Sequence, residues 1–302
     1  MTELAALPTV RPQRLVYLGT PAMAVPALEA LVAHGFDVVL VVTRADKRRG
    51  RGSELMPSPV KSAALRLGLE VSHRVEDALD RHADLGVVVA FGQLIKPHVL
   101  SELPMLNLHF SLLPRWRGAA PVERALLAGD AVTGVCLMQI DEGLDTGPVL
   151  SVVDAPIGER ETADELRSRL VTAGTDLLIK ALVEGLPTPR PQVGGPSYAA
   201  KLQPDEFAIN WHSSAVEINR LVRLGVAWTS LRGKRLKVLM AEPTDLAAPA
   251  GTFLEPCIVG CGSGALVLVQ VQPEGKPVMD AGAWANGARP RRGEQFDERA
   301  SA

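Results

Sequence analysis

The chain has 302 residues, which is more than one average domain and suggests two. Hydrophobic residues make up 47% and charged residues 22%, the balance of a soluble globular protein and not of a disordered one. The formal net charge of -2 excludes a global positive field, so any nucleic-acid-binding surface has to be local.

The cysteines and the N-terminus indicate a cellular compartment. Cys136, Cys257 and Cys261 are few and have no paired spacing, which fits a reducing cytoplasm and argues against a disulfide framework. No histidine or cysteine cluster completes four ligands around them, so no metal is expected. No stretch reaches membrane-spanning length, and the first residues lack a long apolar run. We therefore expect a cytoplasmic protein.

The first half of the chain alternates short apolar runs with helical patterns. This is typical of a Rossmann-like parallel sheet covered by helices. Thr20 is expected to cap the first helix, with Pro21 in its first turn. A capping box of Thr162 and Glu165 predicts a helix that ends at Gly185. The predicted strands cover residues 14–19, 37–44, 69–73, 84–92, 105–111 and 134–140.

The second half changes character after this helix. Prolines and glycines between 184 and 202 predict a linker. A capping box of Ser214 and Glu217 predicts one helix, and a hairpin around Gly233 and further short strands predict a small OB-like β-barrel. The last dozen residues read as a frayed tail. The expected division is a catalytic domain over 1–185, a linker over 186–207 and a barrel domain over 208–302.

Polar side chains alternate along the strand predicted over 105–111. Asn107, His109 and Ser111 are two residues apart, so they point the same way on a strand. Asparagine offers a neutral hydrogen-bond donor, and histidine can be a cation or a proton shuttle near neutral pH. Ser111 ends the strand, where ligands settle in open parallel sheets.

A second candidate segment is the glycine-rich loop over 141–150, with Asp141, Glu142 and Asp145. An aspartate beside His109 would favour the charged imidazolium and fix its orientation. Together these groups make an oxyanion stabiliser able to transfer protons. No Gly-x-Ser-x-Gly nucleophile, Gly-x-Gly-x-x-Gly fingerprint or Walker loop is present. The spacing alone leaves open a purely structural histidine and an ordinary Asp-Gly turn.

Four segments carry a family resemblance. "LGTP", "RGRGSELMPSPVK", "NLHFSLLPRWRGAAP" and "TGVCLMQIDEGLDTG" together resemble the folate-dependent formyltransferase family. The "MPSPVK" segment and the second domain are similar to the members that act on charged tRNA. The resemblance implies transfer of the formyl group of 10-formyltetrahydrofolate to the amino group of methionine on initiator tRNA. It implies no metal, no covalent intermediate and no membrane partner, and nothing in the sequence demands more than a monomer.

The matching motifs also imply roles for single residues. The catalytic positions fall on Asn107, His109 and Asp145. The folate-binding positions fall on Ser111, Leu112, Leu113 and Pro114, and on the pterin-cradling loop with Phe91, Gly92, Gln93 and Leu94.

Two basic clusters are expected to contact tRNA phosphates. The first is a loop with Arg44, Lys47, Arg48, Arg49 and Arg51. The second lies on a helix and hairpin of the barrel and contains Arg220, Arg223, Arg232, Lys234, Arg235 and Lys237. A solvated basic turn and a hydrated hairpin are the alternatives.

The chain departs from the family pattern in two places. Lys47 and Arg48 stand where the family usually has Arg-Pro, and a short "LGVAWTS" segment lacks the usual proline-rich turn. Both departures lie in segments expected to face tRNA. A formyltransferase acting on a small amine, such as an amino-sugar nucleotide, would need neither the basic loop nor the barrel. An RNA-binding protein with an inactive Rossmann domain is the rival from another class.

Overall fold

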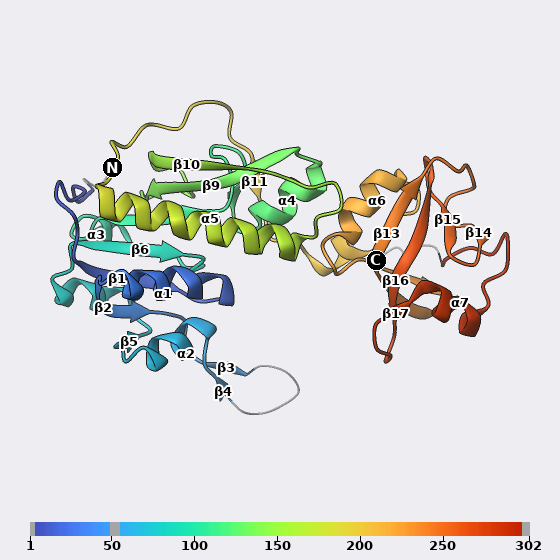
Figure 1. Ribbon diagram of the computed structural model, residues 1–302, viewed down its shortest axis with the longest axis horizontal. Helices are drawn as coiled ribbons and strands as arrows, with labels where there is room; N and C mark the ends of the chain where they lie inside the picture. Colours follow the sequence, from blue (N-terminus) through green and yellow to red (C-terminus); the bar gives the residue numbers. More distant parts are fainter. Residues whose placement is uncertain (1–3, 49–54, 298–302) are drawn as a thin grey trace. The chain divides into compact units, whose positions relative to one another are not determined.

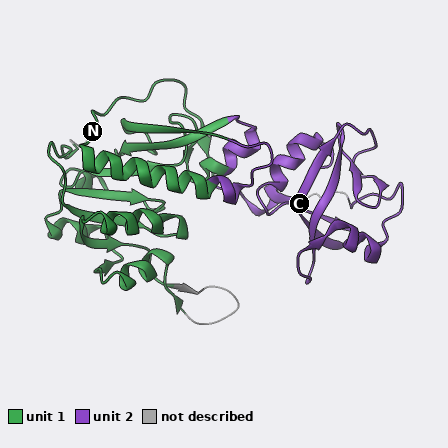
Figure 2. Cartoon of the chain, in the orientation of Figure 1, with its two compact units in different colours: residues 1–122, 132–156, 167–200 green, residues 123–131, 157–166, 201–302 purple. Residues whose placement is uncertain are grey.

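The computed structural model describes residues 4–48 and 55–297, and the chain divides into two compact units (Figure 2). Unit 1 contains residues 1–122, 132–156 and 167–200, and unit 2 contains residues 123–131, 157–166 and 201–302. No helix in the described ranges is long and apolar enough to span a membrane.

Unit 1 is built on a seven-stranded sheet in the order β10-β9-β7-β6-β1-β2-β5 (Figure 1). Its strands are β1 Arg14–Gly19, β2 Asp37–Val42, β5 Val71–Ser72, β6 Leu85–Val89, β7 Met105–His109, β9 Val132–Gln139 and β10 Val149–Pro156. The first five pair in parallel, which confirms the Rossmann-like prediction. β9 runs antiparallel to both β7 and β10, and β10 was not among the predicted strands.

Capping residues predict the starts of two helices in this part of the chain, and one of the two predictions is confirmed. Thr162 and Glu165 form the expected capping box, and the helix after it ends one residue before Gly185. The expectation for Thr20 is wrong, because its hydroxyl donates to the carbonyl of Phe91 and the chain first forms a short 3-10 turn, η1. The helices up to residue 184 are η1 Ala22–Ala24, α1 Val25–Ala33, α2 Pro59–Arg66, η2 Val75–Arg81, α3 Pro97–Leu100, α4 Pro121–Ala128 and α5 Ala163–Glu184. Most of α4 and the first four residues of α5 belong to unit 2.

The long helix α5 covers one face of the sheet at β7 and β9 (Figure 1). Gly174 of α5 lies against Val135 of β9 and Leu108 of β7. Because strand side chains alternate between faces, Asn107 and His109 point to the opposite side from Leu108. The polar face of β7 is therefore the face that α5 leaves uncovered.

Two short strand pairs complete unit 1. β3 Lys47–Arg48 pairs with β4 Leu55–Met56 at the base of the basic loop. β8 Arg117–Gly118 pairs in parallel with β11 Tyr198–Ala199, so the proline-rich linker is bound to the segment that follows β7.

Unit 2 is an antiparallel half-barrel in the strand order β12-β13-β16-β15-β14, with β17 paired to β16. The predicted hairpin is confirmed: Arg232 and Gly233 form its turn with positive φ values of 54° and 73°. The elements are η3 Pro204–Phe207, α6 Ala215–Val222, β12 Trp228–Leu231, β13 Lys234–Thr244, β14 Phe253–Glu255, β15 Ile258–Gly260, β16 Ala265–Pro273, β17 Met279–Asp280 and α7 Ala281–Ala288.

The expectation of a frayed tail is wrong for residues 291–297. Phe296 is 4% exposed and stacks on Trp211 with ring centroids 5.0 Å apart. Gly293 donates its backbone N–H to Phe253, and Asp297 accepts from the backbone of Arg232. The segment closes the core of unit 2, and residues 298–302 lie outside the described part of the chain.

Candidate active site

The two polar side chains of β7 lie in different surroundings. His109 is buried, with 5% of its surface exposed, whereas Asn107 is half-buried. No hydrogen-bond partner for the Asn107 amide is found within residues 4–48 and 55–297. Its donors are therefore available to a ligand.

The loop after β7 folds back onto His109. The strand ends at His109, so Ser111 belongs to this loop rather than to the strand. Ser111 is fully buried, and its hydroxyl donates to the carbonyl of Arg115 at 2.6 Å. The carbonyl of Trp116 lies 2.9 Å from Nε2 of His109. A carbonyl oxygen only accepts hydrogen bonds, so Nε2 of His109 carries a proton in this contact. The other ring nitrogen, Nδ1, points away from Trp116.

Asp145 faces that second nitrogen. Its Oδ2 lies 3.5 Å from Nδ1 of His109 and accepts a hydrogen bond from the backbone N–H of Gly118 at 2.8 Å. β9 is antiparallel to β7, so the loop over 140–148 starts at the amino end of β7 and folds back along it to reach His109. Asp141 shapes this loop by accepting from Gly143 N–H and the Thr146 hydroxyl.

The neighbouring cysteine is not a nucleophile. Cys136 is opposite His109 on β9 and is 1% exposed. Burial raises the pKa of its thiol to about 11, so the thiol stays protonated near neutral pH. In the described residues, no group of three or more histidine, cysteine or acidic side chains could hold a metal ion.

The segment after β6 leaves the same edge of the sheet as the end of β7. Ala90 and Gly92 have φ values of 46° and 69°, which turns the chain sharply. Thr20 donates to the carbonyl of Phe91, and Arg44 donates to the carbonyl of Gly92. Phe91 is buried, whereas Gln93 is exposed and Leu94 is 82% exposed.

The first basic cluster is only partly described. The Arg44 side chain contacts Gly92, and Lys47 and Arg48 form β3. Arg49 and Arg51 lie outside the described residues. At the base of this loop, Asp46 and Lys61 form an ion pair of 2.8 Å with both side chains mostly covered.

The second basic cluster separates into two groups. Arg232 forms a two-pronged pair with Glu294, both contacts 2.7 Å, and donates to the carbonyl of Ala288, the last residue of α7. Arg223 donates to the backbone of Gly158 and Glu161. These arginines therefore have structural contacts. Lys234 is exposed on the hairpin, and the guanidinium of Arg235 lies 4.2 Å from the centre of the Trp228 ring.

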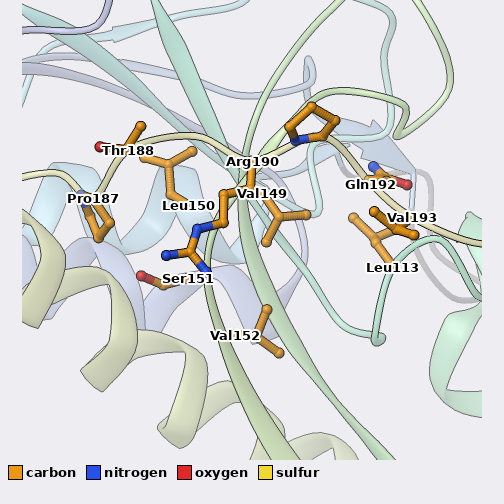
Figure 3. A pocket seen from close by; sticks show the side chains of 11 residues that line it. Leu113, Val149, Leu150, Ser151, Val152, Pro187, Thr188, Arg190, Gln192 and Val193 are labelled. Carbon is orange, nitrogen blue, oxygen red and sulfur yellow. The ribbon is translucent and has the colours of Figure 1, made fainter.

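A cavity of about 620 Å³ lies between β10 and the linker (Figure 3). Its lining includes Leu113, Arg190 and Gln192. Gln192 also donates to the carbonyls of Asp145 and Gly147. Gln192 is not among the site residues predicted from the sequence, because a glutamine in a proline-rich linker carries no spacing signal.

Comparison with known proteins defines the class. Residues 13–182 match the family model described as "Formyl transferase", and residues 201–289 match "Formyl transferase, C-terminal domain". The fold and both matches define a two-domain formyltransferase, and the site at the end of β7 lies within the first matched region.

Similar proteins narrow this class. The chain is 44% identical over 295 residues to the methionyl-tRNA formyltransferase of Jannaschia sp. (strain CCS1), covering 91% of this chain and 97% of that protein. It is 43% identical over 310 residues to the methionyl-tRNA formyltransferase of Thermobifida fusca, covering 94% and 99%. The chain belongs to the methionyl-tRNA formyltransferase family.

Solved structures with lower identity share the fold. An N-formyltransferase from Helicobacter canadensis, in complex with folinic acid and dTDP-3-aminofucose, has a TM-score of 0.67 and 20% identity, covering 86% of this chain and 99% of that chain. HypX from Aquifex aeolicus, in complex with tetrahydrofolic acid, has a TM-score of 0.64 and 14% identity, covering 96% and 51%.

Proposed function

We propose that the chain transfers the formyl group of 10-formyltetrahydrofolate to the α-amino group of methionine on initiator tRNA. Formyl-methionyl-tRNA for translation initiation is then the product. The observation that supports this most directly is the contact of Asp145 with His109 and Gly118, combined with the near full-length similarity to methionyl-tRNA formyltransferases.

We propose that Asn107, His109 and Asp145 perform the chemistry together. The methionine amine attacks the formyl carbon, and the carbonyl oxygen becomes an oxyanion in the tetrahedral intermediate. The Asn107 amide stabilises that oxyanion by a hydrogen bond, and the positive charge of an imidazolium at His109 stabilises it electrostatically. Asp145 stabilises the imidazolium through Nδ1. The proton lost by the amine passes to N10 of the folate as the C–N bond to the folate breaks, so no covalent enzyme intermediate forms.

The 3.5 Å separation of Asp145 and His109 is longer than a hydrogen bond. Catalytic contacts are often long before substrates bind and shorten in the reacting complex. We infer that donor binding shortens this contact.

We propose that the formyl donor lies against two loops at the carboxyl edge of the sheet. Gln93 and Leu94 are exposed at the turn after β6, where a polar and an apolar side chain suit a flat heterocycle with polar edges. Leu112, Leu113 and Pro114 are half-buried in the loop after β7. The hydroxyl of Ser111 is engaged within this loop, so its proposed contribution is to the loop's shape.

We propose that tRNA phosphates contact the basic loop at 44–51 and the hairpin of unit 2. In the hairpin, Lys234 and Arg235 are exposed, whereas the contacts of Arg232 favour a structural role.

In this proposal residues 1–185 form the catalytic domain, 186–207 the linker and 208–302 the tRNA-binding domain. The protein is proposed to act as a monomer in the cytoplasm, without a metal.

The test is a competition between acceptors. The purified chain is given 10-formyltetrahydrofolate and either methionyl-initiator tRNA or a dTDP-amino sugar, and formylated product is quantified. The proposal predicts transfer to the tRNA with no detectable sugar product. Transfer to the sugar alone would instead support the small-amine alternative, and RNA binding without any transfer would support an inactive RNA-binding protein.

A further inference from the structure

The side chain of Gln192 connects the loop that carries Asp145 to the segment after β7 that contacts His109. Its Nε2 donates to the carbonyl of Asp145 and to the carbonyl of Gly147, both at 2.8 Å. Its Oε1 accepts from Nε and Nη2 of Arg117, at 3.1 and 2.6 Å. Both donor hydrogens and both acceptor positions of the amide are therefore used inside the protein.

The linker holds Gln192 in this position by its own backbone. Arg190 exchanges two backbone hydrogen bonds with Val149 of β10, at 2.8 and 2.9 Å. Ser197 accepts from the backbone of Arg117 at 2.9 Å, and β11 pairs with β8. Gln192 lies between these two attachments, on the wall of the cavity in Figure 3.

The contact matters because the backbone of Asp145 is unusual. Asp145 has a φ of 52°, a left-handed conformation that only a few per cent of residues other than glycine adopt. Gln192 binds its carbonyl and the carbonyl two residues later, which fixes the direction in which the side chain leaves the loop. That side chain is the carboxylate 3.5 Å from His109.

We propose that Gln192 is a positioning residue for formyl transfer, acting through Asp145 and not on a substrate. The proposal rests on the catalytic role proposed above for Asp145. It extends the active site into the linker, between residues 182 and 201, a stretch that neither family model matches.

The experiment compares Gln192→Ala, Gln192→Glu and the control Val193→Ala in formyl transfer to methionyl-tRNA. Val193 lines the same cavity and is 87% exposed, so its removal changes the linker without touching Asp145. Gln192→Glu keeps an oxygen for Arg117 but has no N–H for the two carbonyls. Both Gln192 variants are expected to lower kcat about 10- to 100-fold, because small misplacements of a catalytic group have effects of that size. KM for tRNA should stay within about threefold, since no lost contact touches a substrate.

A double variant separates positioning from a general structural role. Gln192→Ala is introduced into Asp145→Ala, and single-turnover rates are measured beside thermal unfolding. If Gln192 acts through Asp145, the double variant is as slow as Asp145→Ala alone, within about twofold. The proposal is overturned if Gln192→Glu retains the parental kcat, or if the alanine change slows the Asp145→Ala background as much as it slows the parent. If Gln192→Ala does not fold, Gln192→Glu replaces it in both comparisons, alone and combined with Asp145→Ala. The parent and Asp145→Ala test the proposed function independently of Gln192. If the parent transfers no formyl group, the proposed function is wrong, whatever the Gln192 variants do.

Discussion

Oδ2 of Asp145 lies 3.5 Å from Nδ1 of His109, and the two side chains come from different elements, the loop over 140–148 and the end of β7. The loop after β7 binds the other nitrogen of His109 through Trp116, and the same loop offers Gly118 N–H to Asp145. The loop after β7 therefore contacts both side chains of the pair, and their relative position depends on it.

Asp145→Asn tests the charge in this contact without removing the side chain. The amide oxygen can still accept from Gly118, but the negative charge facing His109 is lost. We expect kcat to fall about 100- to 10,000-fold, the range for loss of acid–base function, while folate affinity stays near the parental value. Stopped-flow transfer and equilibrium folate binding measure the two quantities. A parental kcat would show that the charge of Asp145 plays no part.

Gly118→Ala tests the backbone on which Asp145 rests. Gly118 has a φ of 116°, and an added Cβ would lie 3.0 Å from the carbonyl oxygen of Ala199. The variant should lose about 1–3 kcal/mol of stability and much of its kcat, because the strain displaces the N–H that binds Asp145. Gly195→Ala is the control, since its Cβ meets nothing within 4 Å. Equal urea unfolding curves for the two variants would contradict the prediction.

Phe296→Ala tests whether the C-terminal segment belongs to the core. Phe296 stacks on Trp211 at 5.0 Å, so the change should cost about 3–5 kcal/mol of unfolding free energy in unit 2. Val278→Ala, at a side chain 50% exposed, should stay within about 0.5 kcal/mol of the parent. Chemical denaturation followed by tryptophan fluorescence gives both values. If the two variants lose similar amounts of unfolding free energy, residues 291–297 do not contribute to the core and form a tail.

Glu294→Gln tests the ion pair behind the hairpin through its pH dependence. Hydrogen bonds from the Arg232 side chain and from the Arg291 backbone lower the pKa of Glu294 from 4.5 to about 2. A carboxyl with a lowered pKa stabilises the folded state above its unfolded value, and the effect is lost as pH falls through the folded one. The parent should therefore be more stable than the variant at pH 7, and the difference should shrink between pH 4.5 and 2. A constant difference in thermal midpoints across that range would assign the stabilisation to another cause.

Lys234→Ala and Arg235→Ala test the proposed phosphate contacts. Each change should weaken tRNA binding and reduce the slope of log K against log salt by about one. Lys180→Ala, an exposed lysine on α5, removes the same charge elsewhere and should leave the slope unchanged. Titration of labelled tRNA at several salt concentrations supplies the slopes. If all three variants keep the parental slope, the hairpin is a solvated surface.

Alternation and capping explain what the sequence predicts well. The apolar positions of β7 place Asn107 and His109 on one face, and the capping boxes at Thr162 and Ser214 mark two helices that begin where expected. These features depend on neighbours within a few residues, so a single sequence contains them.

The remaining features depend on distant contacts. Phe296 is a single aromatic residue in a polar segment, and only the fold brings it to Trp211. The contact of Asp145 with Gly118 spans 27 residues, and the contact of Gln192 with Arg117 spans 75. In the sequence, Arg232 resembles the other cations of the basic hairpin. Its ion pair with Glu294, 62 residues away, is visible only in the folded chain.

The most direct test of the proposed mechanism is the single-turnover rate of formyl transfer by His109→Ala, measured at saturating donor and methionyl-tRNA beside both dissociation constants. We expect a rate at least about 100-fold below the parent, with folate and tRNA affinities within about threefold, because the imidazole acts mainly on the transition state. A parental rate in the folded variant would remove His109 from the mechanism, and with it the reason for the Asp145 contact.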